Sequence, residues 1–285
     1  MVARSRSVKL TFLGTGTSFG VPVVGCGCRV CTSSDSRDQR TRHGALLSFA
    51  EGRNVLIDTP PELRLQLLRE GVDRVDAVWF THVHADHLHG IDDLRIFSLR
   101  GGRSVVAYVS EEARPVLERR FDYIFDPVNI PERGTSKPQI GLRTVGRGRP
   151  ERVAGELFTP LDAPHGQNRV MGFRVGELGY ITDAKKLPPA TIDLLQGVRV
   201  LVLNALWWGD PHPTHFNVEE AVATASLVGA ERTFLTHLTH RVSHAELERA
   251  LPPGVSPAYD GLALDVPSGE TVTPSDLSHP RERSE

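Results

Sequence analysis

The chain is predicted to form an α/β fold, a four-layer αββα sandwich of two mixed sheets with helices on the outer faces. Predicted strands come in two runs, each interleaved with helices. Short, fully apolar strands such as Val200-Leu201-Val202-Leu203 are typical of sheets buried on both faces. The 285 residues, of which 39% are hydrophobic, suffice for a sizeable core in one large domain.

The first run of elements follows from apolar alternation and turn residues. Strands are expected at residues 8–15, 45–49, 54–58, 77–81 and 105–109, with a hairpin joining the second and third. Helices are expected at residues 61–70, with Pro61 at the start and Gly71 after the end, at 87–99 and at 111–120. Residues 121–152 are rich in Pro, Gly and Arg and receive no assignment.

The second run repeats this pattern. Strands are expected at residues 157–163, 170–175, 179–182, 198–203 and 232–236, and helices at 188–195, 218–227 and 243–250. Short strands near residues 258–259 and 262–265 would close the fold. We therefore expect one domain over residues 1–267, followed by a polar, disordered tail at 268–285.

Charge and apolar patterning argue against several classes of protein. The formal net charge of -2 provides no overall basic field for nucleic acid. No apolar run approaches the length of a membrane span, and residues 1–9 lack the apolar region of a signal peptide. Three closely spaced cysteines fit a reducing compartment better than a secreted disulfide framework. These features predict a cytoplasmic protein that does not bind membranes.

A dense group of potential metal ligands follows the apolar run Val78-Trp79-Phe80. The segment reads His82-Val83-His84-Ala85-Asp86-His87. An apolar run before such a group indicates a buried strand that delivers ligands to a loop and the first turn of a helix. Imidazole and carboxylate together suit divalent zinc, manganese or iron, and the spacing can serve two ions.

This segment matches the HxHxDH signature, and the chain resembles the metallo-β-lactamase superfamily. The resemblance implies the αββα fold and further ligands from distant segments. Three apolar strands each end in Thr, and the next residue is a potential metal ligand: His82, Asp183 or His237. These three strand ends should therefore lie close together at one site. The resemblance implies two ion sites bridged by Asp183, one formed by His82, His84 and His165 and the other by Asp86, His87 and His237.

A second metal pattern lies near the N-terminus. Cys26, Cys28 and Cys31 form CxCxxC, a zinc-binding pattern in which flanking glycines let the backbone wrap a small ion. A tetrahedral structural site needs a fourth ligand, and His240 follows the proposed ligand His237 by three residues. The alternative is three reduced cysteines in a loop.

The combination of this knuckle with HxHxDH and with THxxH at 236–240 resembles the PhnP family, phosphodiesterases of the carbon–phosphorus lyase pathway of phosphonate metabolism. The stretch from Leu13-Gly14-Thr15-Gly16 to Gly20-Val21-Pro22 and the triplet Tyr259-Asp260-Gly261 share this resemblance, which covers about residues 9–264. A relative in pyrroloquinoline quinone biosynthesis has a similar knuckle but a degraded HxHxDH motif.

The resemblance implies hydrolysis of a small cyclic phosphodiester of the phosphoribosyl 1,2-cyclic phosphate type, and of 2′,3′-cyclic nucleotides. Two metal ions about 4 Å apart clamp such a substrate and supply a hydroxide at neutral pH. By resemblance, His215 protonates the leaving oxygen. Without the resemblance, the simpler interpretation of His215 is a residue near the N-cap of the helix at 218–227, with no catalytic role. His212 is an alternative proton donor to the leaving oxygen. The carboxylates of Asp86 and Asp183 orient or deprotonate the attacking water.

Other histidines and one aspartate receive minor roles. Asp58 either accepts a hydrogen bond from a ligand imidazole or is a turn residue before Pro60. His43, His89 and His244 are assigned no catalytic role.

Two other functions are weighed. A tRNase Z-like endoribonuclease shares the two-metal site, but that branch carries a basic arm and lacks the knuckle, and no arm is evident. A non-catalytic metal-binding module is disfavoured by the intact HxHxDH motif. The resemblance favours manganese over zinc at the paired site, a structural zinc ion in the knuckle, and a homodimer.

Overall fold

Strand residues alternate between two apolar environments, and this alternation explains the layered architecture. The computed structural model describes residues 7–267. In β2 (Gly44–Phe49), Ala45 and Leu47 belong to the core between the two sheets, whereas Leu46 belongs to a core on the outer face. In β11 (Val200–Asn204), Val202 faces the inner core and Leu203 the other outer core. Because successive side chains of a strand point to opposite faces, both faces of each sheet are apolar and must be covered.

The first sheet has seven strands and mixed direction. Strands β14, β1, β2 and β3 pair antiparallel, and β3, β4, β5 and β6 pair parallel. In sheet order the strands are β14 (Ala263–Pro267), β1 (Ser7–Gly14), β2, β3 (Arg53–Ile57), β4 (Ala77–Trp79), β5 (Val105–Ser110) and β6 (Ile140–Val145).

The second sheet mirrors this organisation. Strands β13, β12, β11 and β10 pair parallel, and β10, β9, β8 and β7 pair antiparallel. In sheet order they are β13 (Val255–Pro257), β12 (Arg232–Thr236), β11, β10 (Leu178–Ile181), β9 (Asn168–Val175), β8 (Glu156–His165) and β7 (Glu151–Val153).

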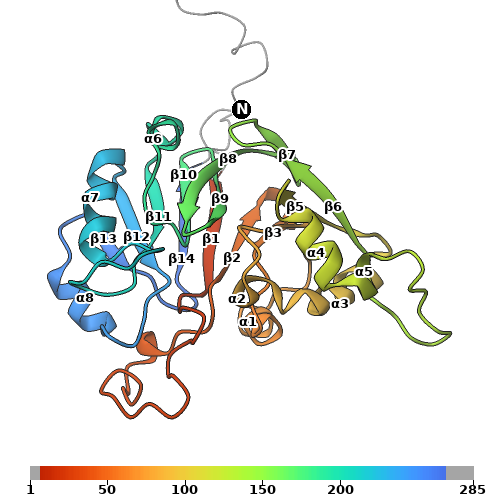
Figure 1. Cartoon of the computed structure of the whole chain (residues 1–285), viewed down its shortest axis with the longest axis horizontal. Helices are drawn as coiled ribbons and strands as arrows, with labels where there is room; N and C mark the ends of the chain where they lie inside the picture. Colours follow the sequence, from red (N-terminus) through yellow and green to blue (C-terminus); the bar gives the residue numbers. More distant parts are fainter. Residues whose placement is uncertain (1–6, 268–285) are drawn as a thin grey trace, which may run out of the picture.

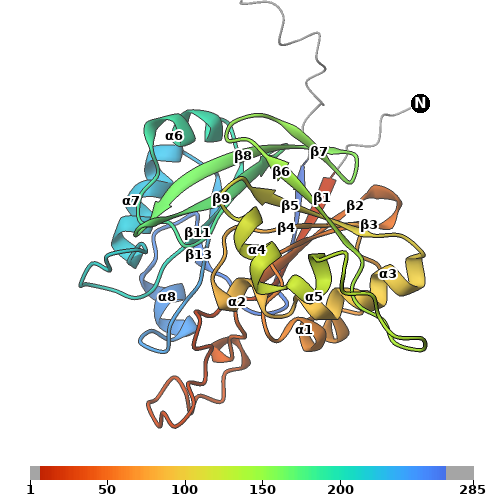
Figure 2. The ribbon, with the colours of Figure 1, turned by 45° about the vertical axis from the view of Figure 1, so that its right-hand side comes forward.

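Helices cover the outer faces of the two sheets, as Figures 1 and 2 show. On the side of the first sheet lie α1 (Leu63–Arg69), α2 (Ala85–Leu88), α3 (Arg95–Gly101), α4 (Arg114–Arg120) and α5 (Asp122–Phe125). On the side of the second lie α6 (Pro189–Leu195), α7 (Val218–Val228) and α8 (His244–Ala250). Three 3₁₀ turns complete the list, at Ser36–Asp38, Ala50–Gly52 and Ile91–Leu94. The predicted four-layer αββα fold is confirmed.

Aromatic side chains fill the space between the sheets. Phe158 lies with its ring centroid 5.5 Å from that of Trp79 and 5.2 Å from that of Phe173, and all three are fully buried. The Trp79 indole donates a hydrogen bond to the carbonyl oxygen of Met171 at 2.9 Å, which joins the two sheets. Each such side chain contributes roughly 1.5–3 kcal/mol by leaving water, so this core fixes the relative position of the strand ends that carry the site.

The predicted helix at residues 87–99 is wrong as one element. It breaks into α2, the 3₁₀ turn Ile91–Leu94 and α3. The break lies at Gly90, whose N–H donates to the carbonyl oxygen of Thr59 at 2.8 Å. A Cβ atom there would lie 2.1 Å from the carbonyl oxygen of Pro60, so only glycine fits this close approach. Packing against the 59–60 segment therefore overrides the helical pattern.

Two further segments depart from the expectations. The unassigned residues 121–152 contain α5, β6 and β7. The strand expected near residues 258–259 lies slightly earlier, as β13. The predicted disordered tail at 268–285 lies outside the described residues. Within residues 7–267, every helix is too short or too polar to cross a membrane.

Candidate active site

The ligand-type residues lie on loops that leave strand ends of both sheets. His82, His84, Asp86 and His87 follow β4, with the last two in α2. His165 ends β8, Asp183 follows β10 and His237 follows β12. Asp183 and His237 have φ values of 57° and 59°, in the left-handed region that non-glycine residues rarely adopt. Each bend lies within two residues of the end of a strand, and such local strain is typical of functional sites.

The structure brings all seven predicted residues together. The ligand atoms of His82, His84 and His165 lie within 4.8 Å of one another, and so do those of Asp86, His87 and His237. One carboxylate stands between the groups. Oδ2 of Asp183 lies 3.7 Å from Nε2 of His82, and 3.3 Å from Nε2 of both His87 and His237. This position suits a carboxylate that touches two cations.

Several imidazole nitrogens in this cluster are buried without a hydrogen-bond partner among the described residues. They are Nε2 of His82, Nε2 of His87 and both ring nitrogens of His237. Buried polar atoms are nearly always satisfied, so such a convergence requires an explanation. A divalent cation bound by the imidazole lone pairs supplies one, and the residues present fit a pair of such ions.

The electrostatics of the cluster also suit cations. Burial alone would raise the pKa of the Asp183 carboxyl, but the neighbouring imidazoles of His237 and His87 hold it well below its usual range. Burial lowers the pKa of His82 well below its usual value, so this imidazole is neutral. Burial opposes protonation of His87 as well, but Asp183, Asp58 and Asp86 raise its pKa well above the usual value.

Hydrogen bonds beneath the cluster orient the ligands. Nδ1 of His87 donates to Oδ2 of Asp58 at 2.6 Å, and both residues are fully buried. Asp58 also accepts from the N–H and hydroxyl of Thr81, at 2.8 and 2.7 Å. Nδ1 of His165 lies 3.1 Å from the carbonyl oxygen of Thr214. These contacts hold the protons on Nδ1, so that the lone pair of each imidazole lies on Nε2, the nitrogen that faces the cluster. Of the two interpretations of Asp58, the geometry supports the contact with a ligand imidazole.

His215 reaches the same cluster from the loop before α7. Its Nε2 lies 3.4 Å from Oδ2 of Asp183, and its ring stacks on that of His237 with centroids 5.0 Å apart. The N-cap of α7 is Asn217, so capping does not explain this inward position. His212, the competitor, contacts His215, with their Nδ1 atoms 3.2 Å apart.

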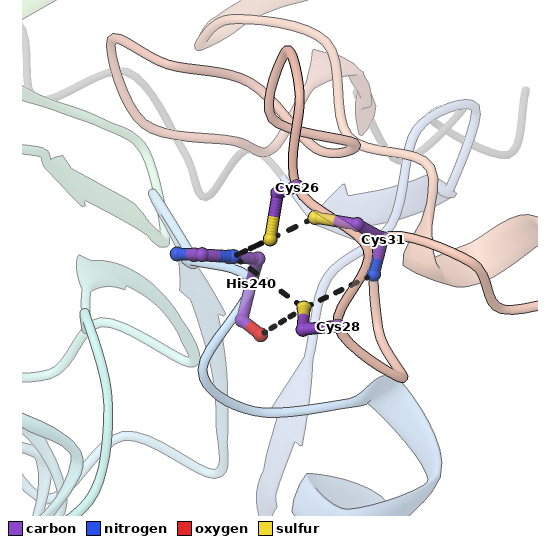
Figure 3. Close-up of side chains that lie close together, drawn as sticks. All are labelled: Cys26, Cys28, Cys31 and His240. Carbon is purple, nitrogen blue, oxygen red and sulfur yellow. Dashed lines mark hydrogen bonds between the residues drawn. The ribbon is translucent and has the colours of Figure 1, made fainter.

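The three cysteines meet His240, as Figure 3 shows. The Sγ atoms of Cys26, Cys28 and Cys31 lie 3.3, 3.5 and 3.5 Å from Nδ1 of His240. The thiols are free, with no disulfide between them. A backbone hydrogen bond from Cys31 lowers the pKa of Cys28 to about 6, which favours the thiolate that metals bind. One nitrogen and three sulfur donors fit a tetrahedral zinc ion.

The sequence interpretation missed His43. Its Nε2 lies 2.9 Å from the hydroxyl of Tyr180 and its Nδ1 lies 3.3 Å from that of Thr236. The ring is fully buried, with its centroid 5.5 Å from that of His87, so His43 forms part of the floor of the site. A single histidine before a strand carries no motif that could have revealed this. His89 is exposed, whereas His244 is buried beneath Tyr259, away from the cluster.

Residues 53–238 match the family described as "Beta-lactamase superfamily domain". The chain belongs to the metallo-β-lactamase superfamily. Within this superfamily, the crystal structure of a diphosphatase from the PhnP family is similar to 91% of this chain and 97% of that one, with a TM-score of 0.83 and 39% identity. This similarity confirms the predicted resemblance to the PhnP family.

Two curated proteins are also similar to this chain by sequence. An octanoyltransferase from Porphyromonas gingivalis is 37% identical over 256 residues, which cover 90% of this chain but 51% of that protein, so the chain spans about half its length. A ribonuclease Z from Pyrobaculum neutrophilum is 26% identical over 289 residues, covering 88% of this chain and 93% of that protein. The family and the site together define a metal-dependent hydrolase of the metallo-β-lactamase fold.

Proposed function

We propose that the chain is a binuclear metal-dependent phosphodiesterase that hydrolyses a small cyclic phosphodiester of the phosphoribosyl 1,2-cyclic phosphate type, and 2′,3′-cyclic nucleotides. The position of Asp183 carries this proposal, because its Oδ2 lies within 3.7 Å of imidazoles from both ligand groups and 3.4 Å from His215. When bound, two divalent ions neutralise charge on the phosphoryl oxygens and lower the pKa of a water molecule.

The residues of the chain then move the protons. A water oxygen forms the new bond to phosphorus, and its proton passes to the carboxylate of Asp86 or Asp183. The P–O bond to the leaving oxygen breaks, and this oxygen keeps the electron pair and takes a proton from Nε2 of His215. A histidine at this place, beside the carboxylate between the ion sites, suits a general acid.

We assign manganese or zinc to the paired site and one structural zinc ion to the knuckle, since both donor sets allow these ions. We also propose that the protein acts in the cytoplasm as a homodimer.

Hydrolysis of a panel by purified, metal-analysed protein tests the function. The panel contains bis-p-nitrophenyl phosphate, 2′,3′-cyclic AMP, phosphoribosyl 1,2-cyclic phosphate, a linear diphosphate ester and a precursor tRNA. The proposal expects turnover of the cyclic diesters, abolished in His84→Ala and retained in His89→Ala, because His89 is exposed and outside the ligand groups. Absence of phosphodiester turnover in protein loaded with manganese or zinc would contradict it.

Two arms of the panel address other candidates. The ribonuclease Z relative favours precursor tRNA as the second candidate substrate. The diphosphatase similarity makes the diphosphate ester a further arm, because water attacks phosphorus in both reactions, although the bond that breaks is a P–O–P anhydride bond and not a P–O–C ester bond. Cleavage of tRNA in preference to the small diesters would replace the first proposal with the second.

A further inference from the structure

One loop carries a ligand-type residue of each metal site. Residues 237–243 connect β12 to α8 and contain no helix or strand. His237, the first residue of this loop, belongs to the active-site cluster. His240, three residues later, lies among the three cysteines, as Figure 3 shows. The conformation of this single loop therefore decides where a ligand of each site is placed.

The buried guanidinium of Arg40 holds the loop. Its side chain is fully shielded from solvent. Nη1 donates to the carbonyl oxygen of Thr239 at 2.5 Å and to that of Val242 at 3.1 Å, and Nη2 also donates to the carbonyl oxygen of Val242 at 3.1 Å. These two carbonyl groups lie on either side of His240 in the chain. A rigid fork of donors that contacts both of them fixes the backbone around His240.

The backbone of Arg40 holds the cysteine segment as well. Arg40 and Val21 exchange two hydrogen bonds, in which the N–H of each donates to the carbonyl oxygen of the other at 2.8 Å. This pairing closes the base of residues 22–39, which carry all three cysteines of the chain. Arg40 thus joins the two halves of the knuckle, the cysteine segment through its backbone and the histidine loop through its side chain.

Asp38 keeps the guanidinium in place. Its Oδ1 accepts from Nη2 of Arg40 at 3.1 Å and from the N–H of His244, the first residue of α8, at 2.7 Å. Nε of Arg40 is buried without a hydrogen-bond partner among residues 7–267, so the desolvation of the guanidinium is only partly offset. Since apolar residues often replace a buried ion pair at no cost in stability, stability alone is a weak explanation for this pair.

We propose that Arg40, held by Asp38, is a positioning residue that places His240 and His237 through their shared loop, so that metal binding at the knuckle and metal binding at the paired site are coupled. This inference deepens the proposed function and rests on its assignment of ions to both sites. Arg40 supplies no ligand atom and acts through the carbonyl groups of Thr239 and Val242.

The metal affinities of Arg40→Lys test the proposal. Lysine keeps the charge, but its single ammonium group lacks the fork that spans both carbonyl groups and Asp38. Because every cysteine of the chain lies in the knuckle, the charge-transfer absorption of bound cobalt reports thiolate ligation at that site alone. We expect cobalt to bind the knuckle 10- to 100-fold more weakly, the range found for residues that orient metal ligands. Manganese, followed by electron paramagnetic resonance of the free ion, should bind the paired site roughly 5-fold more weakly or worse.

Cys28→Ser, alone and combined with Arg40→Lys, measures the coupling. Both substitutions act on the paired site through the same loop, so each alone should weaken manganese binding. The double variant should bind manganese little more weakly than the weaker-binding single variant. Fully additive losses, or manganese binding that is indifferent to Cys28→Ser, would overturn the coupling.

Arg174→Lys is the matched control. Arg174 also donates to three backbone carbonyl oxygens at 2.8–3.0 Å, but away from both metal sites, on Gly176, Leu194 and Gln196. This control should lower the free energy of unfolding in urea and leave both metal affinities unchanged. Should Arg40→Lys fail to fold, Asp38→Asn carries the same test, because it keeps the shape of the side chain and removes the charge that faces Arg40.

Metal binding is measured without substrate, so this inference and the proposed function fail separately. Coupled loss of both metals, in a wild-type background that hydrolyses no phosphodiester, supports the role of Arg40 and contradicts the proposed function. Wild-type metal affinities at both sites in the folded Arg40 and Asp38 variants overturn the role of Arg40, whether or not phosphodiesters are hydrolysed.

Discussion

Replacing Asp58 with asparagine tests how the ligand cluster is held. Asp58 is fully buried and accepts three hydrogen bonds, two from Thr81 and one from Nδ1 of His87. Its φ value of 63° is tolerated by asparagine as well as by aspartate, so Asp58→Asn adds no backbone strain. The amide of the variant can preserve both contacts with Thr81, because its carbonyl oxygen accepts from the N–H and its NH₂ group donates to the hydroxyl.

The contact with His87 cannot be preserved in its present form. The NH₂ group then faces Nδ1, so the imidazole must move or carry its proton on Nε2, the nitrogen that faces Asp183. A hydrogen bond to a charged group contributes roughly 1.5–3 kcal/mol. This loss corresponds to a weakening of metal binding on the order of 10- to 100-fold, the range found for residues that orient metal ligands.

Metal content by mass spectrometry and kcat/KM with bis-p-nitrophenyl phosphate measure the effect. Asp260→Asn is the control, since Asp260 also accepts several hydrogen bonds, from Thr15 and Thr41, and these are partly buried and lie outside the cluster. We expect the control to lose stability with its metal content unchanged. Wild-type metal affinity and kcat/KM in Asp58→Asn would refute the reasoning.

Three further perturbations address the fold and the knuckle. Gly90→Ala places a Cβ 2.1 Å from a backbone carbonyl oxygen and should lower the free energy of unfolding in urea by about 1–3 kcal/mol. Gly141→Ala, which has open space around its Cβ, is the control and should change this free energy little. Equal effects of the two substitutions would contradict the packing argument. Ser243→Ala removes the side-chain N-cap of α8 and should cost about 1 kcal/mol in the same assay, and an unchanged midpoint would show that the cap contributes nothing. Cys28→Ser should lower the zinc content by one ion per chain and lower Tm, because metal binding is linked to folding; full zinc content would exclude the knuckle as the site.

Local patterns predicted much of the layered fold. Strand alternation and the apolar run Val200-Leu201-Val202-Leu203 predicted sheets covered on both faces, because period-two burial is a property of the strand itself. The helix at 87–99 was wrong, because the close approach of Gly90 to the carbonyl oxygen of Pro60 involves a segment about thirty positions away in the chain and leaves no local signal.

The sequence by itself determined the ligand types and their order, since HxHxDH and CxCxxC place several donors within a few residues, where local backbone geometry limits where they can lie. Only the tertiary structure decided that the Asp183 carboxylate stands between the two groups and that His215 turns inward onto it. The position of His43 beneath the site was also unpredictable. These positions depend on how the two sheets pack and on left-handed bends at single residues, and neither property is encoded by spacing along one strand.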